Sequence, residues 1–113
     1  MGKQLIDDVF AGADDMQLDQ QEMYTAYAWC DVFERDGLPR TTRMLINIAS
    51  LSVLGERDTL KLHVRAALAL GCSRAEIREA IMQAGTIGGG VRATLACRAA
   101  SEALVDGDGS LTK

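Results

Sequence analysis

The chain holds one histidine, and its neighbours place it beside the predicted core. His63 lies on a segment whose apolar residues Leu60, Val64, Ala67 and Leu68 recur at helical spacing. We therefore expect His63 to border the core rather than to face open water. An imidazole whose ordinary pKa is about 6.5 suits proton transfer near neutral pH. The same spacing is also typical of a structural histidine at a core edge, so both interpretations stay open at this point.

A second candidate is an arginine on a segment that is otherwise mostly apolar. Arg43, Asn47 and Ser50 recur at helical spacing and form the polar stripe of residues 40–54. A charged side chain on a buried helix needs a partner, because an unpaired buried charge costs several kcal/mol. The partner of Arg43 is either a structural carboxylate or a bound anion.

Aromatic residues are scarce and concentrated in one predicted helix. Four of them fall within ten residues: Tyr24, Tyr27, Trp29 and Phe33. Trp29 and Phe33 are four residues apart, so we expect their rings to pack together, and a core role is the simplest one. The same helix carries Glu22, which together with Arg43 and His63 provides a possible acid, base and anion clamp.

Cysteine and glycine patterns argue against other kinds of site. Cys30, Cys72 and Cys97 are too widely spaced for a C-x-x-C pair, so we expect reduced, mostly buried thiols. With a single histidine, the sequence predicts no metal site. The run Gly88–Gly90 precedes a helix but lacks the full pattern of a phosphate-binding loop. We interpret it as a hinge or a loop of close approach.

The elements that must position these residues are all helical, so the sequence predicts an all-α bundle of about six helices. No strand-type alternation persists. Ser73 and Glu76 form a capping box that begins one helix. The residues after 105 read as a frayed tail, 106–113. The predicted helices are Lys3–Ala11, Gln20–Glu34, Arg40–Leu54, Asp58–Leu70, Ser73 to about Ala84, and Val91–Val105.

Length and charge narrow the class of protein. We expect 113 residues to form one domain, 1–113, with its core in 20–105. Residues 1–36 carry nine acids against two bases, whereas 37–105 carry nine bases, eight of them arginine, against five acids. The net charge of −4 argues against nucleic acid as a partner, and the arginines favour a small anion. With no membrane-spanning stretch or signal peptide recognised, we expect a cytoplasmic protein with no membrane partner.

Two helices predict self-association. Apolar residues surround most of the helix over 40–54, and a helix of this kind is buried on most sides. The last helix repeats alanine at helical spacing, which permits close helix–helix approach. A chain of this size has difficulty covering both surfaces, so we expect a homo-oligomer.

Several segments together resemble the carboxymuconolactone decarboxylase family: Gln21–Arg43, Leu60–Ala67, Gly71–Glu79 and the glycine loop at Gly89. The resemblance implies the all-α fold shared with AhpD-like alkylhydroperoxidases, assembled as trimers or hexamers. It implies removal of CO2 from 4-carboxymuconolactone, or from a related carboxylated lactone or keto acid, in aromatic-compound catabolism. It implies no metal or organic cofactor.

The resemblance also implies site residues. Glu22, Trp29, Arg43 and His63 match recurring pocket positions of the family. In this scheme Arg43 clamps a carboxylate or the developing oxyanion, and His63 donates a proton. Glu22 orients or recharges His63, while Trp29 walls the pocket and excludes water. The catalytic candidates are therefore His63, Glu22 and Arg43.

Further substrate-binding candidates are Trp29, Tyr27, Asn47, Ile87 and Gly89. At three places near them the chain departs from the family. Tyr27 replaces the usual histidine before Ala-Trp, and Ile87 and Val91 replace the tyrosine and proline of Tyr-x-Gly-x-Pro. The predicted pocket is consequently less polar than is usual in the family.

Two alternatives to a decarboxylase remain. Thiol peroxidases of the same fold need a C-x-x-C pair one turn before the histidine, and this chain has Glu56 and Thr59 there. The other alternative is a non-catalytic oligomeric protein that binds a ligand with the same scaffold.

Overall fold

A computed structural model describes residues 7, 11–12 and 14–108, with 106–108 described for the backbone only. Over this part the chain is all helical and contains no strand, as predicted. The described residues form five α-helices, with a π-helical segment continuing the first of them. Most of Lys3–Ala11, and residues 109–113 of the tail, lie outside the described residues. The elements are α2 (Asp15–Thr25), η1 (Ala26–Val32), α3 (Arg40–Leu54), α4 (Arg57–Leu70), α5 (Arg74–Gly88) and α6 (Gly90–Asp108).

Most boundaries follow the predicted ones, and α3 coincides with its prediction. Helix α2 begins five residues earlier than expected, behind the N-cap Asp14, whose carboxylate accepts from the Gln17 amide at 3.3 Å. Helix α5 continues to Gly88, so its predicted end at about Ala84 is wrong and the break comes later in the glycine run. Residues 106–108, predicted as frayed, continue α6.

The predicted capping box at the start of α5 is confirmed. The Ser73 hydroxyl oxygen accepts from the Glu76 amide at 3.0 Å, and the Glu76 carboxylate accepts from the Ser73 amide at 2.8 Å. The break between α5 and α6 is at Gly89, whose φ of +95° suits a residue without a side chain. These two local signals set where α5 begins and ends.

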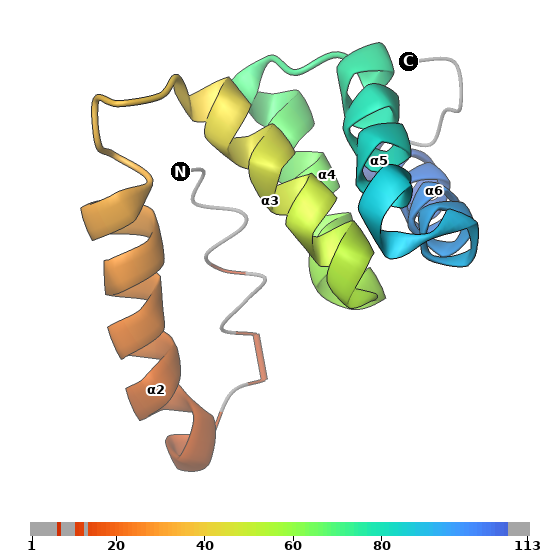
Figure 1. The fold of residues 1–113 in the computed structure, drawn as a ribbon. Helices are drawn as coiled ribbons and strands as arrows, with labels where there is room; N and C mark the ends of the chain where they lie inside the picture. The colour runs from red at the N-terminus through yellow and green to blue at the C-terminus, as the bar shows by residue number, and fades with distance from the viewer. Residues whose placement is uncertain (1–6, 8–10, 13, 109–113) are drawn as a thin grey trace.

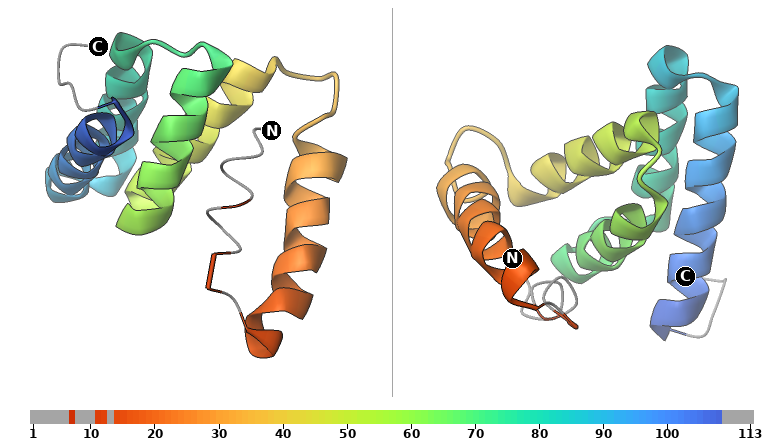
Figure 2. Two further views of the ribbon diagram at one scale, coloured as in Figure 1. Left: turned by 180° about the vertical axis from the view of Figure 1, so that it is seen from behind. Right: turned by 90° about the horizontal axis from the view of Figure 1, so that it is seen from below.

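Helices α3 to α6 form one bundle, in which α3 packs mainly on α5 and α4, and α6 on α4 and α5. Figures 1 and 2 show α2 standing to one side of this bundle. The largest fully buried apolar side chains are Met44, Ile48, Leu60, Val64 and Ile81. Alanines of α6 complete the core and allow its close approach, as their spacing predicts: Ala96, Ala99, Ala100 and Ala103.

The apolar surface of α3 is only partly covered by the described part of the chain. The buried residues of α3 are Met44, Ile48 and Ser52. Ile46 is 48% exposed and Leu54 is 67% exposed. Burial on most sides, which the sequence predicts for this helix, is therefore not provided by α4, α5 and α6. None of the described helices combines the length and apolar character needed to cross a membrane.

Candidate functional site

A cavity of about 280 Å³ opens where η1 meets the first turns of α3. We call it the aromatic cavity. It brings together four of the predicted site residues, Tyr27, Trp29, Arg43 and Asn47, which come from two elements separated by a loop. The rest of its wall is apolar. The other lining residues are Ala28, Val32, Phe33, Leu38 and Ile46.

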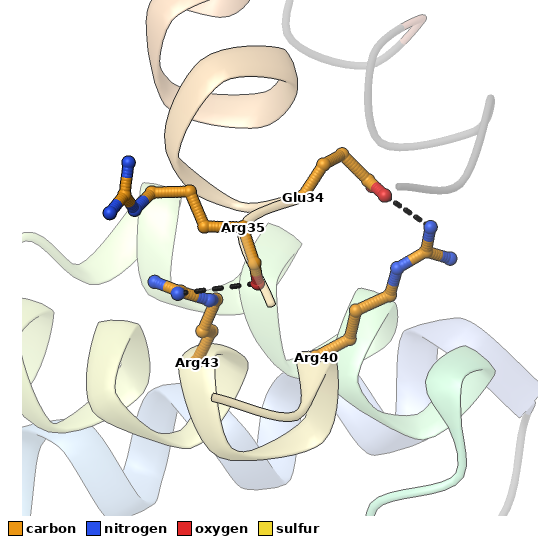
Figure 3. A network of polar contacts seen from close by, with 4 residues as sticks. All are labelled: Glu34, Arg35, Arg40 and Arg43. Carbon is orange, nitrogen blue, oxygen red and sulfur yellow. Dashed lines mark hydrogen bonds and ion pairs between the residues drawn. The ribbon is translucent and has the colours of Figure 1, made fainter. Parts of the chain in front are cut away.

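Arg43 is the one cationic residue that lines this cavity. Its Nη2 donates to the carbonyl oxygen of Arg35 at 3.4 Å, as Figure 3 shows. Its Nε is buried and has no hydrogen-bond partner among the described residues. The nearby Glu34 carboxylate pairs with Arg40 on the exposed side of the loop. Arg43 therefore brings a guanidinium with one buried, unpartnered N–H to the wall of a mostly apolar cavity, and a guanidinium is the side-chain group that best matches a carboxylate.

The aromatic wall comes from a π-helical segment that the sequence analysis did not predict. In η1 the Phe33 amide donates to the carbonyl of Ala28, five residues earlier, at 2.9 Å. Such wide turns are rare and are frequent at functional sites. The rings of Trp29 and Phe33 pack edge to face with centroids 5.3 Å apart, as their spacing predicts. Phe33 is buried in the core and anchors η1 to the bundle.

His63 lies on α4 and is 8% exposed, which confirms its predicted position at the core. Its Nδ1 is 2.9 Å from the carbonyl oxygen of Thr59. A carbonyl only accepts, so Nδ1 carries the hydrogen and Nε2 of the neutral ring is the basic nitrogen. Burial lowers the pKa of His63, and the bond to Thr59 opposes this in part. The imidazole is consequently neutral at pH 7.

His63 stands behind the cavity wall rather than in it. Its ring lies against Trp29, with centroids 5.3 Å apart and planes tilted by 37°. Trp29 lines the aromatic cavity, whereas His63 does not. The indole thus separates the imidazole from the space in which Arg43 is placed.

The remaining predicted site residues lie elsewhere in this chain. Glu22 is exposed on α2, about 10 Å along the helix axis from Trp29, and its carboxylate forms no hydrogen bond or ion pair with a described residue. Gly89 lines a second cavity, of about 530 Å³. Ile87 is 84% exposed and lines neither cavity. Within one chain the structure does not bring these three to Arg43.

Some residues of the site were not anticipated. Leu38 and Ile46 line the aromatic cavity, and the Thr59 carbonyl fixes the hydrogen on His63. Ile46 could have been predicted from the sequence, because it is adjacent to the candidate Asn47 on the helix that carries Arg43. A contact between residues four apart is common in a helix, so spacing alone does not single out Thr59. The contact indicates the tautomer of His63 because the ring is also buried.

Metal and thiol chemistry find little support in the described residues. Among them no group of three or more histidine, cysteine, aspartate or glutamate side chains could hold a metal ion. The three cysteines are unpaired. Cys72 is buried and Cys97 is half-buried, but Cys30 is exposed, so the prediction of mostly buried thiols is wrong for Cys30.

Comparison with known proteins decides the family. The model of the carboxymuconolactone decarboxylase family matches residues 19–102. The chain belongs to this family. The match covers the aromatic segment, Arg43, His63 and the glycine loop together, so the resemblance inferred from separate motifs is confirmed.

Two curated relatives of this chain are both named as decarboxylases. A 4-carboxymuconolactone decarboxylase of Acinetobacter baylyi is 32% identical over 106 residues, which are 94% of this chain and 79% of the relative. The nitrosuccinic acid decarboxylase npaB of Metarhizium robertsii is 31% identical over 86 residues, or 74% of this chain and 59% of the relative. The two names share a reaction type but not a substrate.

Proposed function

We propose that this protein is a cofactor-independent carboxy-lyase. Its substrate is 4-carboxymuconolactone or a related carboxylated lactone or keto acid. The observation that carries the proposal is the buried, unpartnered Nε of Arg43 beside a mostly apolar cavity. Family membership and two relatives named as decarboxylases support the reaction type. A cavity of about 280 Å³ is near the lower end for small organic ligands.

The reaction needs two things that the site can supply. When the bond to the carboxylate breaks, CO2 leaves and its electron pair passes into the unsaturated lactone as a dienolate. Arg43, with the amide of Asn47, stabilises this developing oxyanion or holds the carboxylate before it leaves. The mostly apolar wall of Trp29 and Phe33 excludes water and strengthens these contacts. The dienolate carbon then takes one proton, so the overall reaction consumes a proton.

We assign the proton to His63. Its neutral ring presents Nε2 as a base at pH 7, so the ring first takes a proton from solvent and then delivers it. Because burial lowers the pKa of His63, the protonated fraction grows as pH falls. Turnover limited by this step increases toward acidic pH, and His63→Ala lowers it about 10²–10⁴-fold. The intervening Trp29 ring has to move aside for the transfer. If His63 only positioned other groups, a His63→Gln variant would keep the pH profile of the parent protein.

We also propose that the protein acts as a homo-oligomer, a trimer or hexamer. None of the residues of α2 is buried within the described chain. Three of its large apolar side chains, Met16, Met23 and Tyr24, are each more than half exposed. Ile46 and Leu54 of α3 are exposed as well. Light scattering then gives at least three times the single-chain mass of 12.1 kDa at micromolar concentration. A mass of one chain would contradict the proposal.

The decisive experiment supplies 4-carboxymuconolactone and follows release of CO2 together with formation of the enol-lactone. Arg43→Gln removes the charge from the cavity and lowers kcat/KM by about 10²-fold or more. Arg40→Gln is the matched control: it lies one turn earlier on α3, is exposed, and does not line the aromatic cavity. It leaves turnover unchanged.

Other outcomes separate the alternatives. Binding of the lactone without CO2 release would show a ligand-binding protein and refute the enzyme. Release of CO2 from a keto acid but not from the lactone would keep the reaction type and change the substrate. Equal losses in Arg43→Gln and Arg40→Gln would remove Arg43 from the site.

A further inference from the structure

The second cavity, of about 530 Å³, lies at the opposite end of α3 from the aromatic cavity. We call it the glycine-loop cavity. It forms where the C-terminal turn of α3 meets the first residues of α4 and α6, which are joined to their preceding helices by Gly55–Glu56 and Gly89. Its apolar lining consists of Leu51, Leu54, Leu60, Val91, Leu95 and Ala96.

Two arginines line this cavity, Arg57 at the start of α4 and Arg92 in the first turn of α6. Nη1 of Arg92 lies 2.6 Å from the position that a Cβ on Gly55 would occupy. The absence of a side chain at Gly55 therefore leaves room for the guanidinium at the end of α3. The guanidinium of Arg92 forms no hydrogen bond or ion pair with any residue that the structure describes.

One acid also lines the cavity, so its charges must be weighed. Glu56 is the N-cap of α4, and its side chain makes no capping hydrogen bond. Arg57 lies close enough to Glu102 on α6 to help lower the pKa of that carboxyl, although Lys61 contributes more. Two arginines against one glutamate leave the lining positive. An anion that contacts Arg92 and Arg57 is the ligand that this charge pattern favours.

The backbone adds to the same preference. The first-turn amides of α4 and of α6 have no partner within their own helices, because every helix begins with such amides. At α6 the preceding residue is Gly89, which has no side chain with which to cap them. Both helix starts line the cavity, so these donors supplement the arginine side chains.

We propose that the glycine-loop cavity binds an organic carboxylate, with the carboxylate at Arg92 and Arg57 and the hydrocarbon part on Leu51, Leu60 and Leu95. The apolar lining selects such a molecule over inorganic phosphate, which has no apolar surface to bury. The site is separate from the proposed reaction site, since Arg43 and Leu54 are eleven residues apart on α3, about 16 Å along its axis. The proposal goes beyond the proposed decarboxylation and does not depend on it.

A binding measurement tests the site without any assay of turnover. The ¹⁵N-labelled protein is titrated with benzoate and, separately, with inorganic phosphate, while amide shifts are followed. We expect benzoate to move the amides of Gly89, Gly90 and Arg92. Arg92→Gln should weaken this binding about tenfold or more, because a charge-assisted contact is lost.

Two control variants make the result specific. Arg98→Gln changes an exposed arginine on the same helix that does not line the cavity, and it should bind benzoate at the glycine-loop cavity as the parent does. Arg43→Gln should also retain this binding, even where it abolishes a response at the aromatic cavity. Each variant's amide spectrum first verifies that it is folded.

Three results would overturn the proposal. The first is a benzoate response confined to the amides around Trp29 and Arg43. The second is an Arg98→Gln variant that loses as much binding as Arg92→Gln, and the third is phosphate that binds as tightly as benzoate. The last result would show a simple anion site in which the apolar lining plays no part. None of these results would bear on CO2 release, so failure here is distinguishable from failure of the proposed function.

Discussion

The imidazole of His63 lies against the indole of Trp29, with ring centroids 5.3 Å apart. This contact links α4 to η1, two elements whose backbones do not pack together in the described part of the chain. Trp29 faces the aromatic cavity on one side and covers the histidine on the other. The protonation of His63 and the shape of the cavity therefore depend on the same side chain.

Trp29→Ala should raise the pKa of His63 toward its ordinary value of about 6.5, because burial is the main cause of its lowering and the indole provides part of that burial. His63 is the one histidine of the sequence, so its ring protons can be titrated by NMR without assignment. Tyr27→Ala is the control, since Tyr27 lines the same cavity and is 60% exposed. An unchanged pKa in Trp29→Ala would mean that α4 and its neighbours alone desolvate the ring.

Stability should fall as the solution is acidified below about pH 6.5, with His63 as one cause. The pKa of His63 is lower in the folded protein than in the unfolded chain, so between the two values the unfolded chain binds more protons. The free energy of unfolding therefore decreases as pH falls through this window. At higher pH the histidine is neutral in both states and does not change how the free energy of unfolding varies with pH.

Urea unfolding at pH 8 and pH 5 measures this effect. His63→Gln, which does not titrate, should show a smaller loss of stability between the two pH values than the parent protein. Carboxylates contribute to acid destabilisation in both proteins, so the difference between them isolates the histidine. Equal losses in the two proteins would contradict the shift in pKa.

Gly88→Ala should destabilise the protein by about 1 kcal/mol, because overpacking outweighs the gain in helix propensity. A Cβ at Gly88 would lie 3.3 Å from both Cα and Cγ2 of Val53, and the Val53 backbone cannot easily move within α3. Gly90→Ala is the matched control, since a Cβ there meets nothing within 4 Å. Chemical unfolding compares the two variants, and a Gly88→Ala variant as stable as Gly90→Ala would show that α3 and α5 can separate at no cost.

Much of the fold follows from local signals in the sequence. The capping residues Ser73 and Glu76 and the glycines that end α3 and α4 act within one turn of the backbone, so they are legible without any knowledge of packing. Gly85 shows the limit of this approach. The predicted helix ends just before this glycine, yet α5 continues through it. A Cβ there would lie 3.0 Å from the Cβ of Ala93, so the glycine is needed for the close approach of α6.

The helical class, the family and the types of residue available for chemistry can be predicted from the chain alone, because periodicity, caps and motif order are local or linear properties. Helix packing, by contrast, sets which of these residues meet. It joins Arg43 and Asn47 to Trp29 and Tyr27, places His63 behind the indole, and assigns Gly89 to a different cavity. The physical reason is that a side chain's neighbours depend on how helices distant in sequence pack, and on the π-helical turn that orients Trp29, neither of which spacing along one helix records.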